Sequence, residues 1–332
     1  MSLTILQPGF GTTVQDSGRT GFRQLGVSPG GAADAFGARV ANLLVGNPED
    51  LAVLEVTLGG VRMAFDDSRI VAWCGGDFSV KVDGVSVPPG RPCRVMAGEE
   101  LSFGGAKSGC RAWVAVSGGV DVPPVLGCRS TDLRGGFGGF KGRTLRAGDA
   151  LPLGGNSPMA EHLLEKLARK RVPSWGAPFE WSAPGRGRAV LHFVRGSNWS
   201  RFEDSAFAAF IREPFSVSPD SDRMGVRFDG PLMERSDGGG DLVSEAVVPG
   251  TIQVPPGGKP ILLLADCQTI GGYPKLAHVI TTDFPIAAQI RPGDPVWFRE
   301  ISFSASHRLL LERERDLQMF RTGFKLHAHA AN

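Results

Sequence analysis

Short apolar runs separated by glycine and proline dominate the chain, and they predict strands rather than helices. Within Ala189–Val194, Leu191 and Phe193 share one face and alternate with residues of the other face. Ile261–Ala265 is continuously apolar, as expected for a strand buried on both faces. The predicted strands are Ile70–Cys74, Phe78–Val82, Ala112–Val116, Ala189–Val194, Val226–Phe228, Ile261–Ala265 and Val296–Phe298.

Helical spacing of apolar residues is confined to a few segments. We predict helices over Ala32–Val45, Pro158–Arg171, Trp199–Ile211 and Ser306–Arg321. Gly46 follows the first of these as a C-cap, and Gly323 is predicted to end the last. The sequence therefore predicts a mainly β fold with a few flanking helices.

The length of 332 residues suggests one large domain or two ordinary ones, and 46 glycines with 24 prolines indicate many turns. Val87-Pro-Pro-Gly recurs as Val254-Pro-Pro-Gly, either because turns converge on the same chemistry or because the chain holds two related halves. We predict a β-barrel half over 1–155, a helical and proline-rich connector over 156–186, a second half over 187–300, and a C-terminal helix and tail over 301–332.

Charge and cysteine usage narrow the classes of function. The net charge of +2 does not require a nucleic-acid partner. No apolar run reaches the length of a membrane span, and the first residues lack a signal-peptide core. Five widely spaced cysteines argue against a disulfide framework or a thiolate zinc site. We therefore expect a soluble, cytoplasmic protein without a protein-bound metal.

Phosphate-binding P-loop, nucleophile-elbow and HExxH signatures are missing, so the candidate chemistry rests on carboxylates, arginines, amides and backbone loops. The first candidate group is Gln15, Asp16 and Arg19 in a glycine-flanked loop, with Asp34 at the start of the following helix. The alternative for this group is a purely structural Asp16–Arg19 turn lock.

A second group is the glycine-rich stretch from Arg129 to Arg143, in which Arg129, Asp132 and Arg134 are candidates for binding an acidic substrate or phosphate. An exposed loop with solvated charges is the alternative. A third group, around Arg223, suits either an anion or a salt bridge with Asp220 or Asp222.

The fourth group follows the apolar strand that ends at Ala265. Asp266, Gln268 and Tyr273 cluster there, and Gln253 precedes the strand. Two glutamine amides can bind an amide or ureido group, and Asp266 can act as a base or orient one. The alternative is a turn in which Asp266 caps its own backbone.

Four stretches carry a resemblance to a known family. They are Gly9-Phe-Gly-Thr-Thr-Val-Gln-Asp-Ser-Gly-Arg19, Arg129-Ser-Thr-Asp-Leu-Arg-Gly-Gly-Phe-Gly-Gly139, Ser221-Asp-Arg-Met-Gly225 and Asp266-Cys-Gln-Thr-Ile-Gly-Gly-Tyr-Pro274. In order and spacing they resemble the allophanate hydrolase subunit 2 (KipA-like) family, over roughly residues 3–320.

The resemblance implies two cyclophilin-like β-barrels and a role as a subunit of an ATP-dependent 5-oxoprolinase, which opens a lactam to glutamate. ATP, with Mg²⁺, is the implied co-substrate. The implied partners are a KipI-like (allophanate hydrolase subunit 1) protein and a lactam-utilisation-type subunit. In such an assembly we expect Gln253, Asp266, Gln268 and Tyr273 to position substrate.

We further expect Arg129, Asp132, Arg134 and Arg223 to bind anionic groups, with Gln15, Asp16, Arg19 and Asp34 in support. The stretches Ile252-Gln253-Val-Pro-Pro-Gly and Asp266-Cys-Gln-Thr-Ile-Gly-Gly-Tyr273 resemble the stand-alone branch of the family. Two alternatives stay open: biotin-dependent carboxyl transfer to a urea-like substrate, and a non-enzymatic KipA-like antagonist that binds a KipI-like kinase inhibitor.

Overall fold

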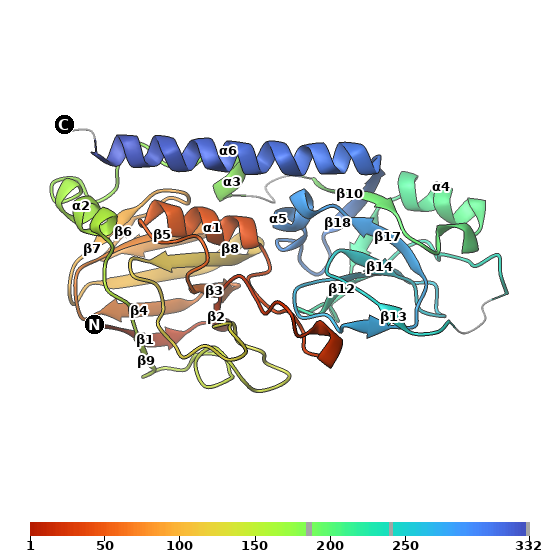
Figure 1. Ribbon diagram of the computed structural model, residues 1–332, viewed down its shortest axis with the longest axis horizontal. Coiled ribbons are helices and arrows are strands. Elements are labelled where there is room, and N and C mark those ends of the chain that lie inside the picture. Colours follow the sequence, from red (N-terminus) through yellow and green to blue (C-terminus); the bar gives the residue numbers. More distant parts are fainter. Residues whose placement is uncertain (184–187, 239–241, 330–332) are drawn as a thin grey trace.

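The computed structural model describes residues 1–183, 188–238 and 242–329 of the chain. Figure 1 shows an N-terminal and a C-terminal half beside each other, with one long helix lying along both. No helix in these described ranges is long and apolar enough to cross a bilayer. The predicted domain limits and connector stay a prediction.

The N-terminal half is built on a nine-stranded sheet whose central path runs β2-β3-β8-β4-β1-β9, while β5 pairs with β6, β7 and β8. Its strands are β1 (Ser2–Pro8), β2 (Gly11–Gln15), β3 (Val53–Thr57), β4 (Val61–Phe65), β5 (Arg69–Val82), β6 (Val85–Ser86), β7 (Cys93–Val95), β8 (Glu100–Val116) and β9 (Ala150–Pro152).

The two faces of this sheet lie in two different cores. Val71 and Trp73 of β5 pack into the core between the strands, while Ala72 and Cys74 pack beneath helix α1 (Ala35–Leu44). This double burial explains why the strand reads as a continuous apolar run. Residues 1–65 add four strands that the apolar pattern did not predict.

The predicted strands Ile70–Cys74 and Phe78–Val82 are one strand, which corrects the sequence-based division. Pairing with β8 continues across Gly75 with a shift of register. A Cβ atom on Gly75 would stand 2.3 Å from the carbonyl oxygen of Arg111, so the glycine permits a close approach of the two backbones. The polar, glycine-rich interruption is therefore a bulge and not a turn.

The C-terminal half is a closed barrel in the order β10-β17-β14-β15-β12-β11-β18, which the parallel pair β10 and β18 closes. Its strands are β10 (Ala189–Arg195), β11 (Phe215–Val217), β12 (Gly225–Asp229), β14 (Thr251–Gln253), β15 (Ile261–Leu263), β17 (Lys275–Val279) and β18 (Pro295–Glu300). A short sheet pairs β13 (Glu245–Ala246) with β16 (Ile270–Gly271). The aromatic rings of Phe210, Phe215, Phe228 and Phe298 contact one another in the barrel core.

The mainly β prediction is confirmed. The C-terminal strands form a closed barrel, whereas the N-terminal strands pair as the nine-stranded sheet. Besides α1 the helices are α2 (Pro158–Lys166), α3 (Phe179–Ser182), α4 (Asp204–Arg212), α5 (Phe284–Ala287), α6 (Phe303–His329), and the 3₁₀ turns η1 (Arg23–Leu25), η2 (Trp199–Arg201) and η3 (Thr281–Asp283).

Two helix predictions need correction. The segment Trp199–Ile211 is the turn η2 followed by α4, because the backbone is extended at Phe202 and Glu203. Helix α6 does not end at Gly323 but continues to His329. Leu317 and Phe324, on either side of that glycine, are both buried against the core beneath α1, and this packing outweighs the low helix propensity of glycine.

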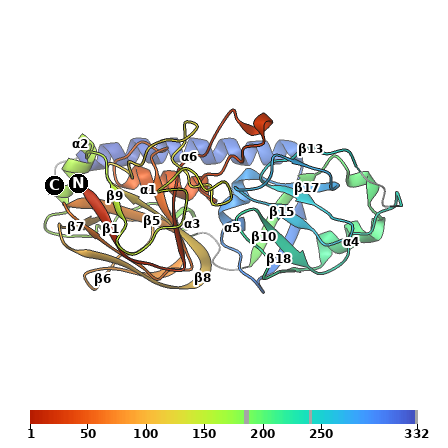
Figure 2. The same cartoon turned by 90° about the horizontal axis from the view of Figure 1, so that it is seen from below.

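Helix α6 connects the two halves of the molecule. It starts next to β18 and runs back over α1 and α2 (Figures 1 and 2). The guanidinium of Arg39 in α1 donates to both carboxylate oxygens of Glu314 in α6, at 2.6 and 2.8 Å. The chain therefore holds its two sheets in one arrangement through a helix as well as through direct contacts.

Candidate functional site

Arg223 joins the two halves at a polar junction. It lies just before β12, and its Nε and Nη2 donate to the two carboxylate oxygens of Asp266 at 2.8 and 3.1 Å. Its Nη2 also donates to the carbonyl oxygen of Gly31 at 2.7 Å, and its Nη1 donates to Glu55. Burial lowers the pKa of Arg223, but the Glu55 and Asp266 carboxylates raise it well above its usual value, so the group is a fixed cation.

Sequence reasoning missed Glu55, which is the N-terminal anchor of this junction. Its side chain, 1% exposed, accepts from the indole N–H of Trp113 at 2.9 Å and the backbone N–H of Ala33 at 3.0 Å. Burial raises its pKa, but the positive charges of Arg223 and Arg111 and the hydrogen bonds hold the pKa below its usual value. The available signal was an acid inside the apolar strand Val53–Thr57, since buried acids are paired.

Asp16 and Arg19 both bond to the segment 128–130. Asp16 accepts from Ser130 Oγ at 2.5 Å, the Arg129 backbone N–H at 2.5 Å and Cys128 Sγ at 2.9 Å. Burial opposes its ionisation, but these hydrogen bonds lower the pKa of Asp16. Arg19 donates to the Ser130 carbonyl oxygen and lies under the ring of Phe137, 4.6 Å from its centroid. The structure thus favours neither a free loop nor the Asp16–Arg19 lock.

Gln15 belongs to strand β2 and not to a loop, which corrects the sequence interpretation. Its side chain is fully buried, and its amide nitrogen donates to Thr13 Oγ1 at 3.0 Å. The register of β2 with β3 pairs Gln15 with Val53 and so keeps its side chain near the Thr131 carbonyl oxygen, 3.4 Å away. Gln15 therefore supports the 128–131 segment from below.

A cavity of about 150 Å³ contains the predicted amide pair. Gln253, Gln268 and Tyr273 line it, together with Met224 next to Arg223. The amide nitrogen of Gln268 donates to Gln253 Oε1 at 3.3 Å, and that of Gln253 donates to the Tyr273 carbonyl oxygen at 3.1 Å. Tyr273 is 46% exposed, so its ring lies at the mouth of the cavity. This cavity adjoins the Arg223–Asp266 pair, because Gln268 follows Asp266 by two residues.

The glycine-rich stretch contributes one residue to this cavity wall from the other half. Arg134 Nη1 lies 2.8 Å from Met224 Sδ. Arg129 instead points back, donating to the Val122 carbonyl oxygen at 2.9 Å and pairing with Asp121 at 3.1 Å. Asp132 Oδ1 accepts the backbone N–H groups of Arg134 and Gly135 at 3.1 and 2.8 Å, which shapes the start of the loop.

Taken by position, all four groups of candidate residues meet at the junction. The turn at Gly31 reaches Arg223, the glycine-rich stretch reaches Met224, and Asp266 is bound by Arg223. In Figure 1 the red segment that carries η1 extends from the N-terminal half to the C-terminal half. Arg23 in η1 donates to the Val247 carbonyl oxygen there. Catalytic and binding roles for these residues remain proposals.

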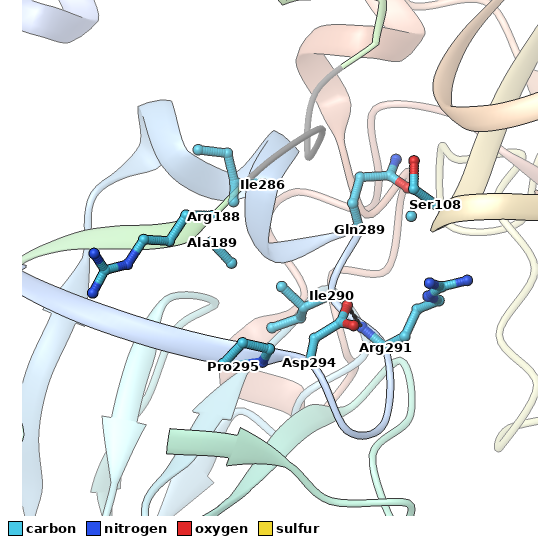
Figure 3. A pocket seen from close by; sticks show the side chains of 10 residues that line it. Ser108, Arg188, Ala189, Ile286, Gln289, Ile290, Arg291, Asp294 and Pro295 are labelled. Atoms are coloured by element: carbon cyan, nitrogen blue, oxygen red, sulfur yellow. Dashed lines mark hydrogen bonds between the residues drawn. The ribbon is translucent and has the colours of Figure 1, made fainter. Parts of the chain in front are cut away.

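A second cavity, of about 160 Å³, lies on the junction near the loop that follows α5 (Figure 3). Gln289 reaches across it to β8. Its Oε1 accepts the backbone N–H groups of Cys110 and Arg111 at 3.0 and 3.1 Å, and its Nε2 donates to the Arg111 carbonyl oxygen at 3.0 Å. These bonds satisfy a buried amide and fix the two halves to each other.

Asp34 is the N-cap of α1 and accepts the backbone N–H of Gly37 at 2.8 Å. Its other oxygen, Oδ2, has no hydrogen-bond donor within the described chain. Burial raises the pKa of Asp34 to about 6; the Gly37 bond and the charge of Arg313 oppose this, and the charge of Glu55 adds to it. Stabilisation of the carboxylate by the helix dipole, which the sequence suggested, is therefore outweighed by burial.

This raised pKa predicts a pH-dependent effect of Asp34→Asn on stability. Because the folded chain binds the Asp34 proton more tightly than the unfolded chain, the stability due to protonation is full below the ordinary aspartate pKa of 3.8 and is lost as pH rises to about 6. Asparagine keeps the cap and stays neutral. Relative to wild type, the free energy of unfolding of the variant should rise by about 3 kcal/mol between pH 4 and 7. Urea unfolding at each pH measures this, and a difference that is constant with pH contradicts it.

The described residues hold no group of three or more His, Cys, Asp or Glu side chains arranged to bind a metal ion. All five cysteines are free and buried. Burial raises the pKa of Cys267 to about 11, and the Asp266 charge adds to this, so the thiol beside the candidate site is a poor nucleophile near neutral pH.

Comparison with known proteins gives a consistent result. Residues 25–300 match the family model described as carboxyltransferase domain, subdomain A and B. The chain is 38% identical to the C subunit of 5-oxoprolinase from Escherichia coli, covering 94% of this chain and 96% of that protein. It is 34% identical to the C subunit of 5-oxoprolinase from Haemophilus influenzae, covering 93% and 94%.

Among solved structures, the K. lactis urea amidolyase superposes with a TM-score of 0.86 at 30% identity and covers 96% of this chain. This chain spans only 20% of the length of that protein. The predicted family resemblance is confirmed. With a match across residues 25–300 and close relatives that it covers almost completely, the chain belongs to the family of carboxyltransferase domain subdomains A and B.

Proposed function

We propose that this chain is the C subunit of an ATP-dependent 5-oxoprolinase complex, which hydrolyses 5-oxo-L-proline to L-glutamate. The observation that carries the proposal is the pairing of two glutamine amides in one cavity beside a buried ion pair. Near-complete coverage of two proteins that bear the name of this 5-oxoprolinase component, at 38% and 34% identity, supports it.

The cavity chemistry fits a lactam. A lactam presents its N–H and its carbonyl oxygen on neighbouring atoms, and a primary amide offers the complementary acceptor and donor. Gln253 and Gln268 bond to each other when no substrate is present, so a lactam would exchange one protein hydrogen bond for two. The phenol of Tyr273 can close the mouth over the ring.

In this proposal Asp266 and Arg223 hold the polar side of the site. Asp266 is oriented by two N–H groups of Arg223, and its position next to Gln268 suits a role in directing water or a proton. Arg129, Asp132 and Arg134 would contribute to binding anionic groups, and Gln15, Asp16, Arg19 and Asp34 would support the backbone around them. ATP would supply the activation of a poorly electrophilic amide.

The word "subunit" in the names of both relatives supports action with other chains. We propose as partners a KipI-like protein and a lactam-utilisation-type subunit, and a cytoplasmic location where ATP is available. The five free cysteines are consistent with a reducing compartment.

The test is glutamate release from 5-oxoproline and ATP by the chain with its two proposed partners, omitting each in turn. We expect glutamate only when all three are present. A verified, folded three-protein complex that releases none would reject the proposal.

A second candidate function is biotin-dependent carboxyl transfer to a urea-like substrate. The description of the matching family model and the superposition on K. lactis urea amidolyase favour it. Incorporation of labelled bicarbonate into urea, in the presence of a biotin carrier, would distinguish it from lactam hydrolysis. The same protein preparations serve both assays.

A further inference from the structure

Arg19 is a buried cation whose hydrogen-bonding capacity is mostly unused. The residue is 1% exposed, and its Nε and Nη1 have no hydrogen-bond partner within the described chain. Its side chain contacts the Ser130 carbonyl oxygen through Nη2 and the ring of Phe137 through the guanidinium face. A guanidinium has five N–H donors, so most of its donors remain free.

Other buried arginines of this chain are neutralised by acids. Arg69 has Asp67 at 2.9 Å, and Arg223 has both Glu55 and Asp266. No carboxylate in the described ranges stands within ion-pair distance of Arg19. Removing an unpaired charge from water is costly, and a protein retains one where something else binds it. The missing partner is therefore an anion from outside the chain.

Two glycines leave the space beside this guanidinium open. A Cβ atom on Gly30 would stand 3.0 Å from Arg19 Nη1, and one on Gly138 would stand 2.5 Å from Nη2. Asp266 Oδ1 is 3.9 Å from that same Gly30 position, so the free Nη1 lies toward the candidate site. Any larger residue at 30 or 138 would occupy this space.

Phe137 separates Arg19 from solvent. The ring covers the guanidinium, and it also lines an open groove of about 440 Å³ along the glycine-rich stretch. Phe140 lines the same groove, with the ammonium of Lys141 5.1 Å from its ring centroid. Rotation of the Phe137 side chain into this groove would expose Arg19 without movement of β2.

We propose that Arg19 forms a binding subsite for a small oxyanion, a carboxylate or a phosphate group, which reaches the guanidinium when Phe137 turns aside. The free Nε and Nη1 donors would form charge-assisted hydrogen bonds to the anion oxygens. The subsite itself does not depend on the proposed function. Only the identity of the natural anion, the carboxylate of the lactam acid or a phosphoryl group of ATP, depends on it.

The first test is thermal unfolding of the full chain in anion-poor buffer and with inorganic phosphate. Phosphate at a large excess over its dissociation constant should raise the Tm of wild type by roughly 3 °C. Arg19→Met should have a higher Tm than wild type without anion, because the unpaired charge is gone, and should not respond to phosphate. Arg146→Met, at an exposed arginine, is the matched control and should respond like wild type.

A lower Tm for Arg19→Met together with an unchanged phosphate response would show that Arg19 is only structural. If Arg19→Met does not fold, Phe137→Ala decides. Removing the ring that covers the guanidinium should tighten phosphate binding about tenfold, whereas unchanged affinity overturns the proposal.

A second comparison identifies the natural anion. 5-Oxoproline carries a carboxylate and 2-pyrrolidinone lacks it. A Tm rise with 5-oxoproline alone assigns the subsite to the substrate carboxylate, and a rise with phosphate alone assigns it to a phosphoryl group. No response to any of these anions rejects the subsite. A complex that fails to release glutamate while the chain still responds to phosphate rejects the proposed function and leaves the subsite intact.

Discussion

Replacing Arg223 with alanine is expected to lower the free energy of unfolding by about 3–5 kcal/mol, the range found when one partner of a buried ion pair is removed. The variant leaves Glu55, which is almost completely buried, without its strongest cation, and leaves Asp266 without both of its side-chain donors. Urea unfolding at pH 7 measures the loss. The effect should be large because the same side chain serves both halves of the molecule.

Arg195→Ala is the matched control. Arg195 also binds a carboxylate through two nitrogens, at 2.7 and 3.1 Å, but it and its partner Glu300 are solvent-exposed. That variant should unfold like wild type within error. Equal effects of the two substitutions would contradict the importance of the junction pair.

The lowered pKa of Glu55 adds a pH signature to the same experiment. A depressed folded-state pKa contributes stability that is present above the ordinary glutamate value of 4.5 and is lost as pH falls through the folded value. The stability difference between wild type and Arg223→Ala should therefore shrink in acid.

Replacing Asp266 with asparagine is expected to reduce glutamate release by the assembled complex about 100-fold, the cost of misplacing a reacting group. Asparagine matches the volume of the carboxylate but cannot accept both Arg223 N–H bonds as an anion. Because the chain should still assemble, kcat falls while partner binding, measured by co-purification, stays unchanged.

Asp229→Asn provides the control in the same barrel, since Asp229 forms an exposed pair with Lys259. It should retain activity. Full activity of both Asp266→Asn and Asp266→Ala in an intact complex would remove Asp266 from the site.

Much of the fold could be predicted from local pattern, while the site could be predicted only in pieces. The apolar runs located β10, β12 and β18, because their burial follows from a few adjacent residues. The polar cluster after Ala265 was identified for the same reason. The partner of Arg223 was not, because Glu55 lies 168 residues away, and no local rule connects a strand acid to a distant loop arginine.

The remaining errors have physical causes. Gln15 reads as a loop residue because threonine and glycine surround it, but pairing with β3 makes it a strand residue. Asp34 reads as a dipole-stabilised acid, but the core around it removes water and reverses the preference. Gly323 reads as a stop, but burial of its helical neighbours Leu317 and Phe324 keeps the helix intact. In each case tertiary packing outweighs a local preference.

Helix α6 also limits how the halves can move. The chain passes between them twice, once between α3 and β10 and again along α6. Two linkages on one side of a junction permit rotation about a single axis and oppose twisting or sliding. The segment that carries η1 lies on the side away from α6 (Figure 1). Any opening that admits substrate must therefore widen there, and α6 is the fixed edge about which it turns.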